Sequence, residues 1–133
     1  MQKNNLIPFL LLILSGEKVV QHVFVTLALL SDFGGIRSTV DVDYRALAVS
    51  GAVLAVLFAF SFWAVLLKKE WALYLLTAAA AFDVIGEFVA QGTFTIAINV
   101  SILVAVTLLI LCLLQLRNFR KIEKHGAVNR FLH

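Results

Sequence analysis

Four apolar stretches, each about twenty residues long, constrain the fold of this chain more than any other feature. An α-helix rises about 1.5 Å per residue, so such a stretch crosses the roughly 30 Å of hydrocarbon in a bilayer. Hydrophobic residues make up 62% of the 133 residues and charged residues 14%, a composition too apolar for a soluble domain. We therefore predict four membrane-spanning helices at Leu6–Leu30, Ala46–Leu67, Trp71–Gln91 and Thr95–Leu116.

Short connections between these stretches favour a simple topology. The segments KKE (68–70) and GTF (92–94) leave room only for tight turns, so the helices that they join must run antiparallel. We expect an all-α, up-down-up-down four-helix bundle that forms a single transmembrane domain over residues 1–133, with a short basic tail at 117–133. The first stretch lacks a small-x-small cleavage site, so we interpret it as a helix of the protein, not as a signal peptide.

The lysines and arginines predict the orientation of the bundle. With a cytoplasmic N-terminus, the inner side carries Lys3, Lys68, Lys69, Arg117, Arg120, Lys121, Lys124 and Arg130, and the outer side carries only Arg37 and Arg45. This asymmetry follows the positive-inside rule and places both termini in the cytoplasm. Topology and attraction of the tail to anionic lipid explain the basic residues, so we do not expect nucleic acid as a partner.

The longest connection is SDFGGIRSTVDVDYR, at residues 31–45. Gly34 and Gly35 allow a tight backbone turn, and Asp43 is placed to cap the second helix through the amides that begin at Arg45. We interpret this segment as a solvated loop with a helix cap. The alternative is a lid over an outward-facing pocket.

Polar residues interrupt the first and third stretches at matching depths. Lys18 and His22 are four residues apart, as are Asp83 and Glu87, so each pair projects from one face of its helix. Counted from the start of each stretch, the first members lie about 18 Å deep and the second members about 24 Å deep. Because these two helices run in the same direction, we predict that Lys18 pairs with Asp83 and that His22 pairs with Glu87.

The charges of this group do not cancel. A charged residue at a helix centre costs about 2.5–3.5 kcal/mol on insertion scales. Glu17, Asp83 and Glu87 supply three carboxyl groups against the single Lys18, which leaves a net charge of minus two with His22 neutral and minus one with it protonated. Protons, a bound cation or water must balance the remainder.

More polar residues extend toward the predicted outer side, whereas aromatic and leucine side chains fill the inner half. We therefore expect an intramembrane polar pocket that opens outward and is closed inward. Gln91 continues the row of Asp83 and Glu87, and Asn99 and Ser101 lie near the outer end of the fourth stretch. The candidate ligand-binding residues are Glu17, Lys18, Gln21, His22, Asp83, Glu87, Gln91 and Asn99.

Three hypotheses of function remain open. In the first, the pocket binds or passes a small cation, a proton or a protonatable ligand, and a homo-oligomer can complete the pathway. In the second, the buried ion pairs only fix helix packing in a structural or assembly subunit of a membrane complex. In the third, His22 and Glu87 are the acid and base of an intramembrane enzyme acting on a lipid or isoprenoid.

No particular cofactor is indicated. Glu17, His22, Asp83 and Glu87 are an oxygen-rich set with one nitrogen, but they lack the Glu-x-x-His spacing of di-iron bundles. Haem bound through two axial histidines would need a second histidine in the bundle. A cofactor bound to Lys18 as a Schiff base would be unusual in a protein of four helices. A single cysteine, Cys112, excludes an intrachain disulfide and a cysteine-based zinc site within one chain.

Overall fold

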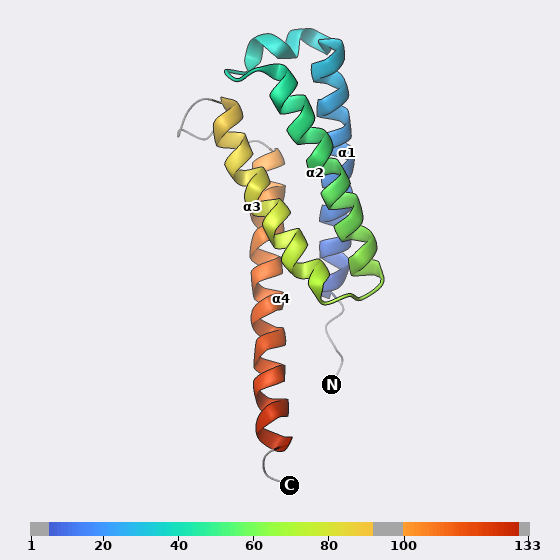
Figure 1. The fold of residues 1–133 in the computed structure, drawn as a ribbon, viewed down its shortest axis with the longest axis vertical. Helices are drawn as coiled ribbons and strands as arrows, with labels where there is room; N and C mark the ends of the chain where they lie inside the picture. Colours follow the sequence, from blue (N-terminus) through green and yellow to red (C-terminus); the bar gives the residue numbers. More distant parts are fainter. Residues whose placement is uncertain (1–5, 92–99, 131–133) are drawn as a thin grey trace.

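The computed structural model describes residues 6–91 and 100–130 and confirms an all-α bundle (Figure 1). The long helices are α1 (Leu6–Ser31), α2 (Tyr44–Leu66), α3 (Trp71–Gln91) and α4 (Val100–Arg130), and a 3₁₀ helix, η1 (Phe33–Thr39), lies between α1 and α2. Each of the four long helices contains a segment that is long and apolar enough to cross a membrane. They indicate an integral membrane protein.

The observed helices match the predicted stretches closely where both are described. The bounds of α1, α2 and α3 differ from the prediction by no more than two residues. Thr95, the predicted start of the fourth helix, lies outside the described residues. The other end of α4 continues well beyond Leu116, so the first part of the basic tail prolongs α4 and projects from the bundle (Figure 1).

The helices form a closed ring in which each one packs beside two others. The helix α1 contacts α2 and α4, and α3 contacts the same two helices. In Figure 1, α1 and α2 make up one half of the bundle and α3 and α4 the other. The two helices that carry the polar pairs, α1 and α3, therefore lie diagonally across the bundle.

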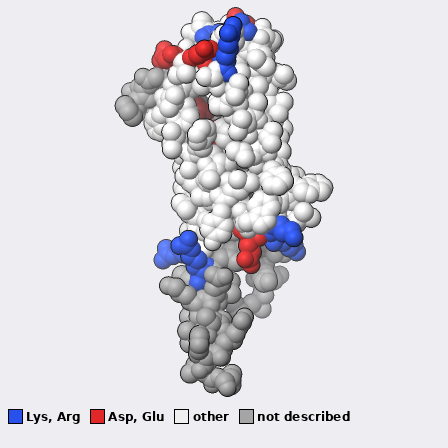
Figure 2. All heavy atoms as spheres, in the orientation of Figure 1, with Lys and Arg blue, Asp and Glu red and all other residues white. Residues whose placement is uncertain are grey.

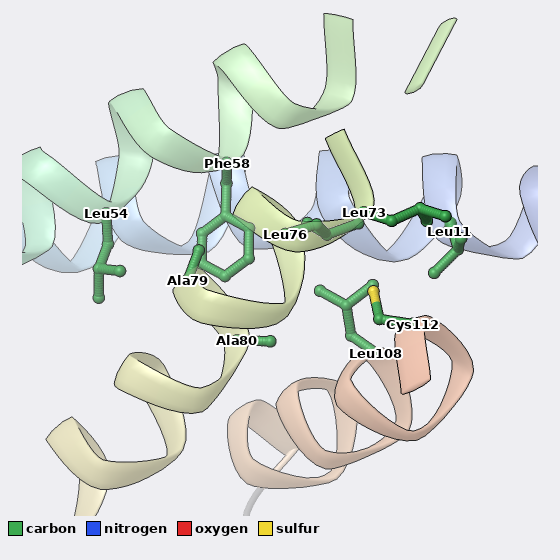
Figure 3. Packing of buried hydrophobic residues seen from close by; sticks show 9 residues of the cluster. All are labelled: Leu11, Leu54, Phe58, Leu73, Leu76, Ala79, Ala80, Leu108 and Cys112. Atoms are coloured by element: carbon green, nitrogen blue, oxygen red, sulfur yellow. The ribbon is translucent and has the colours of Figure 1, made fainter. Parts of the chain in front are cut away.

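An apolar cluster lies between the middle of the bundle and the end formed by the N-terminus and the α2–α3 turn (Figure 3). Three of its larger members, Phe58, Leu76 and Leu108, have no exposed surface. Such close packing supplies van der Waals contact, which is a main source of helix association in lipid. The full cluster contains Leu11, Leu54, Phe58, Leu73, Leu76, Ala79, Ala80, Leu108 and Cys112.

The helices α1 and α2 lie close together at Gly51. A Cβ atom at this position would lie 2.6 Å from Thr26 Oγ1, a distance that real Cβ contacts do not tolerate. A larger residue at this position would therefore require the Thr26 side chain to rotate or the two helices to move apart. By contrast, a Cβ atom added at Gly86 on α3 would meet nothing within 4 Å.

The connection between α1 and α2 is a structured cap. Gly34 and Gly35 adopt φ angles of 68° and 72°, which are readily available to glycine. Asp43 Oδ1 accepts a hydrogen bond of 2.9 Å from the Arg45 amide, as predicted for the N-cap of α2. The backbone amide of Asp41 donates to the carbonyl of Ala90 at 3.3 Å, which ties this connection to α3.

Arg37 connects η1 to the end of α1. Its Nε donates to the Leu29 carbonyl at 2.8 Å and its Nη2 donates to the Leu30 carbonyl at 2.6 Å. These carbonyls belong to the last turn of α1, where no later amide of the same helix can donate to them. The Arg37 guanidinium also lies 4.1 Å from the centre of the Tyr44 ring. One side chain therefore holds η1, α1 and the start of α2 together.

Charged side chains gather at the two ends of the bundle and leave a broad uncharged band between them (Figure 2). One end, called the basic end below, exposes Lys68, Lys69, Arg117 and Arg120. The opposite end, called the η1 end, exposes Asp32, Asp41, Asp43 and Arg45. The uncharged band is the part that a bilayer would cover. That the basic end faces the cytoplasm stays a prediction.

Candidate functional site

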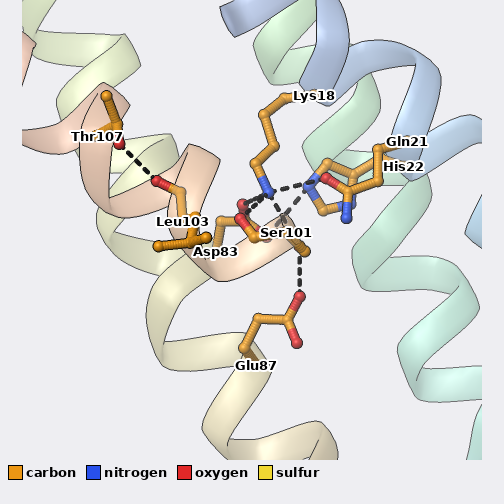
Figure 4. A network of polar contacts seen from close by, with 8 residues as sticks. All are labelled: Lys18, Gln21, His22, Asp83, Glu87, Ser101, Leu103 and Thr107. Atoms are coloured by element: carbon orange, nitrogen blue, oxygen red, sulfur yellow. Dashed lines mark hydrogen bonds and ion pairs between the residues drawn. The ribbon is translucent and has the colours of Figure 1, made fainter. Parts of the chain in front are cut away.

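Lys18 lies at the centre of the candidate site and is completely buried. Its Nζ is 2.8 Å from Asp83 Oδ2, and the Asp83 side chain is only 4% exposed (Figure 4). The predicted pair between the first and third helices is therefore confirmed. The flexible four-carbon stem of a lysine is long enough to cross the diagonal of the bundle, which explains why this contact forms although α1 and α3 are not neighbours.

Three more oxygen atoms surround the same ammonium group. Lys18 Nζ donates to Gln21 Oε1 at 2.9 Å, to the Ser101 carbonyl at 2.8 Å and to Ser101 Oγ at 3.0 Å. Gln21 reaches Nζ because residues three apart lie on the same helix face, and Ser101 reaches it from the first turn of α4. We call these three oxygens and Asp83 Oδ2 the ammonium cage.

The contacts continue in both directions from the cage. Ser101 Oγ donates to Glu87 Oε1 at 2.5 Å, and His22 Nε2 lies 3.2 Å from Asp83 Oδ1. Side chains thus follow one another in the order His22, Asp83, Lys18, Ser101 and Glu87. We call this chain, together with Gln21, the polar network (Figure 4).

The predicted pairing of His22 with Glu87 is wrong. His22 contacts the second oxygen of Asp83, and Glu87 Oε1 takes its hydrogen bond from Ser101. Equal depth in the membrane is not sufficient for pairing, because α1 and α3 lie diagonally and α4 contacts both of them. The His22 imidazole meets α3 at Asp83, and the first turn of α4 brings Ser101 within reach of Glu87.

The centre of the polar network is buried and its ends are partly exposed. Lys18 and Asp83 are buried, while Glu87 is half-buried and the His22 side chain is 12% exposed. The His22 ring stacks on Phe58 of α2 with centroids 5.5 Å apart, so all four long helices contribute to the surroundings of the network. Figure 2 shows acidic atoms recessed among uncharged ones toward the η1 end of the band.

Glu17, another predicted site residue, is not part of the network. It precedes Lys18 by one residue and is therefore turned by about 100° around the helix axis. Its side chain is half-buried, and within the described part of the chain its Oε2 atom is buried with no hydrogen-bond partner. The structure brings together five of the eight predicted residues, namely Lys18, Gln21, His22, Asp83 and Glu87.

The remaining two predicted residues are not tested. Gln91 ends α3, but its side chain lies outside what the structure describes, as does all of Asn99. Ser101, which the sequence placed in the polar outer half without assigning it to the site, joins Lys18 to Glu87. Residue type gave no signal, since Ser15 and Thr107 are also hydroxyl residues in these helices and simply bond to carbonyls of their own helix.

Metal binding is not supported by the described side chains. Over residues 6–90 and the described part of α4, no three His, Cys, Asp or Glu side chains gather as a metal site would require. The four oxygen and nitrogen donors considered from the sequence do not gather around one point. Glu17 is not part of the polar network, and the Asp83 carboxylate already pairs with Lys18.

Comparison with known protein families, curated proteins and solved structures finds no match to this chain. Function must therefore be argued from the geometry of the polar network, because a four-helix bundle by itself implies no activity.

Proposed function

We propose that this membrane protein binds or passes a small cation, a proton or a protonatable ligand at its polar network. The observation that carries the proposal is a missing positive charge. The network contains the carboxyl groups of Asp83 and Glu87 but only one permanent cation, Lys18. With His22 neutral and both carboxyl groups ionised, the network carries a net charge of minus one, and binding of one positive charge makes it neutral.

Burial makes this deficit costly. A net charge inside the hydrocarbon loses its hydration, so protein groups tend to be neutralised or to take up a counter-ion there. His22 is suited to hold the additional proton, because its Nε2 atom lies 3.2 Å from Asp83 Oδ1 and a protonated imidazole would pair with that carboxylate. Glu87, at the other end of the network, is the second group that can take a proton or meet a cation.

The packing favours access from the η1 end. Toward the basic end, the apolar cluster closes the interior with side chains such as Leu11, Leu76 and Cys112, which are at most 1% exposed. His22 and Glu87 are both nearer to the η1 end of their helices than Lys18 and Asp83 are. With the orientation predicted by the basic residues, the network is reached from outside the cell.

Thermal unfolding of the purified protein tests this proposal, with matched glutamate variants. Protons and monovalent cations should raise the Tm of the wild type, and Glu87→Gln should reduce that shift by removing a charge from the network. Glu17→Gln makes the same chemical change at a mid-membrane residue outside the network, so it should keep the shift. A shift that is equal in all three proteins would contradict the proposal.

Passage, as distinct from binding, needs a second measurement. Liposomes that contain the protein and a pH-sensitive dye should show proton or cation flux above that of protein-free liposomes. Glu87→Gln should lower this flux while Glu17→Gln retains it. Cation-dependent stabilisation without any flux would restrict the function to binding.

A structural role is the second candidate, and one observation favours it. The polar network directly links α1, α3 and α4, and His22 adds a contact to α2 through Phe58. Buried polar groups of this kind can fix the register of helices whose surfaces are otherwise equally apolar. The hypothesis of an intramembrane enzyme stays a prediction, with His22 in contact with Asp83 and Glu87 in contact with Ser101.

A further inference from the structure

The ammonium cage has more acceptors than its occupant has protons. Asp83 Oδ2, Gln21 Oε1, the Ser101 carbonyl and Ser101 Oγ all lie 2.8–3.0 Å from Lys18 Nζ. A lysine ammonium group offers three N–H donors to these four oxygens. The cage is thus a complete binding site for a primary ammonium group, contributed by three different helices, in which the protein's own lysine lies.

We propose that the ligand of this site carries a primary ammonium group, which enters the cage in place of Lys18 Nζ. This inference rests on the proposed function and gives its ligand a chemical class. The charge of the network permits the exchange, because it is short of one positive charge when His22 is neutral. An entering ammonium ion supplies that charge, so Lys18 can stay protonated when it leaves the cage. It can then move toward Glu87, because the Ser101 hydroxyl already bonds to both residues.

The distances in the cage discriminate against small divalent metal cations. Oxygens at 2.8–3.0 Å suit N–H···O hydrogen bonds, whereas Mg²⁺ needs about 2.0–2.1 Å and Ca²⁺ about 2.3–2.6 Å. A quaternary ammonium ion has no N–H donor and would leave the buried oxygens without partners. A guanidinium group carries its N–H donors on several nitrogens in one plane, whereas the four oxygens of the cage surround a single nitrogen. A guanidinium therefore does not match the cage.

Chemical rescue tests the cage directly. Lys18→Ala retains Cβ and removes the remaining three carbons and the nitrogen, which together correspond to n-propylammonium. This ion should raise the Tm of purified Lys18→Ala saturably and restore at least half of the Tm that the substitution removes. Neither n-propanol, which lacks the charge, nor tetramethylammonium, which lacks N–H donors, should do so. Equal stabilisation by all three compounds, or by none, would overturn the proposal.

The unaltered protein provides the second measurement, which also decides the question if Lys18→Ala does not fold. Methylammonium should raise the Tm of the wild type more than tetramethylammonium does at the same ionic strength. Ser101→Ala, which removes one cage oxygen and keeps the carbonyl, should weaken the apparent affinity for methylammonium severalfold. No difference between the two ions in the wild type would overturn the displacement of Lys18, even if the variant is rescued.

Failure of this inference and failure of the proposed function give different results. If protons or metal cations stabilise the wild type in a way that depends on Glu87, but primary ammonium ions do not, the ammonium class is wrong and the cation site remains. If no cation or proton shifts the Tm of the wild type, both proposals fail.

Discussion

The apolar cluster and the polar network lie next to each other in one bundle and hold the same helices by different means. The cluster consists of side chains such as Phe58, Leu76 and Leu108, whose contribution comes from many weak contacts and depends on shape. The network depends on a few short, charged contacts centred on Lys18 and Asp83. A change of shape should therefore damage the first region locally, whereas a change of charge should damage the second as a unit.

This difference shows how a helix bundle in lipid acquires one arrangement. Lipid tails are as apolar as leucine side chains, so apolar packing alone distinguishes poorly between alternative helix pairings. The buried ammonium group of Lys18 is stable only where oxygen atoms surround it. Here those oxygens come from α1, α3 and α4. We therefore expect the polar network to favour one set of helix contacts and the apolar cluster to fill the space that results.

Lys18→Met should have the largest effect, and it tests whether the polar network responds to a change of charge as a unit. Removing one partner of a buried ion pair leaves the Asp83 carboxylate uncompensated, so we expect a loss of about 3–5 kcal/mol in the free energy of unfolding. Denaturant unfolding in detergent measures it. Lys18→Met combined with Asp83→Leu removes both charges and should recover most of the loss. A double variant that is no more stable than Lys18→Met would argue against simple pairing.

A truncation in the apolar cluster should have a smaller and separable effect. Leu108 is completely buried, so Leu108→Ala leaves a cavity and should lower the free energy of unfolding by about 2–4 kcal/mol. The cation- or proton-dependent shift in Tm should nevertheless keep its wild-type size, because no charge has changed. Loss of that shift would mean that the cluster and the network are coupled and cannot be treated as two regions.

Gly51→Ala tests close helix approach without altering any charge. The new Cβ would collide with Thr26 Oγ1, so we expect a loss of about 1–3 kcal/mol from displacement of α1 against α2. Gly86→Ala is the matched control, since its Cβ meets open space and alanine is the better helix former by about 1 kcal/mol. Equal destabilisation by both substitutions would show that contact at Gly51 is not the cause.

The smallest effect is expected for Ser101→Ala. The substitution removes the hydroxyl between Lys18 and Glu87 but keeps the backbone carbonyl that also binds Lys18. We expect a loss of about 1 kcal/mol in stability, the usual contribution of a hydrogen bond. Thr107→Ala removes a hydroxyl that bonds only to a carbonyl of its own helix and serves as the control in the same unfolding assay. A loss no larger than that of Thr107→Ala would exclude Ser101 from the network.

Local chemistry made much of this structure predictable. The lengths of the apolar stretches gave α1, α2 and α3 to within two residues, and the aspartate before the second helix gave the Asp43 cap. The pairing of Lys18 with Asp83 followed from equal depth in helices that run in the same direction. These predictions succeeded because helix rise and helix periodicity are properties of the local backbone.

The tertiary structure decided which groups complete the site. Sequence determined that a lysine, a histidine and three carboxyl groups lie inside the membrane, because charge and hydropathy are fixed by residue type. It did not determine that α1 and α3 lie diagonally, that Ser101 reaches between Lys18 and Glu87, or that Glu17 is excluded. The rotation of each helix about its axis and its position in the ring decide those contacts, and both result from packing among all four helices.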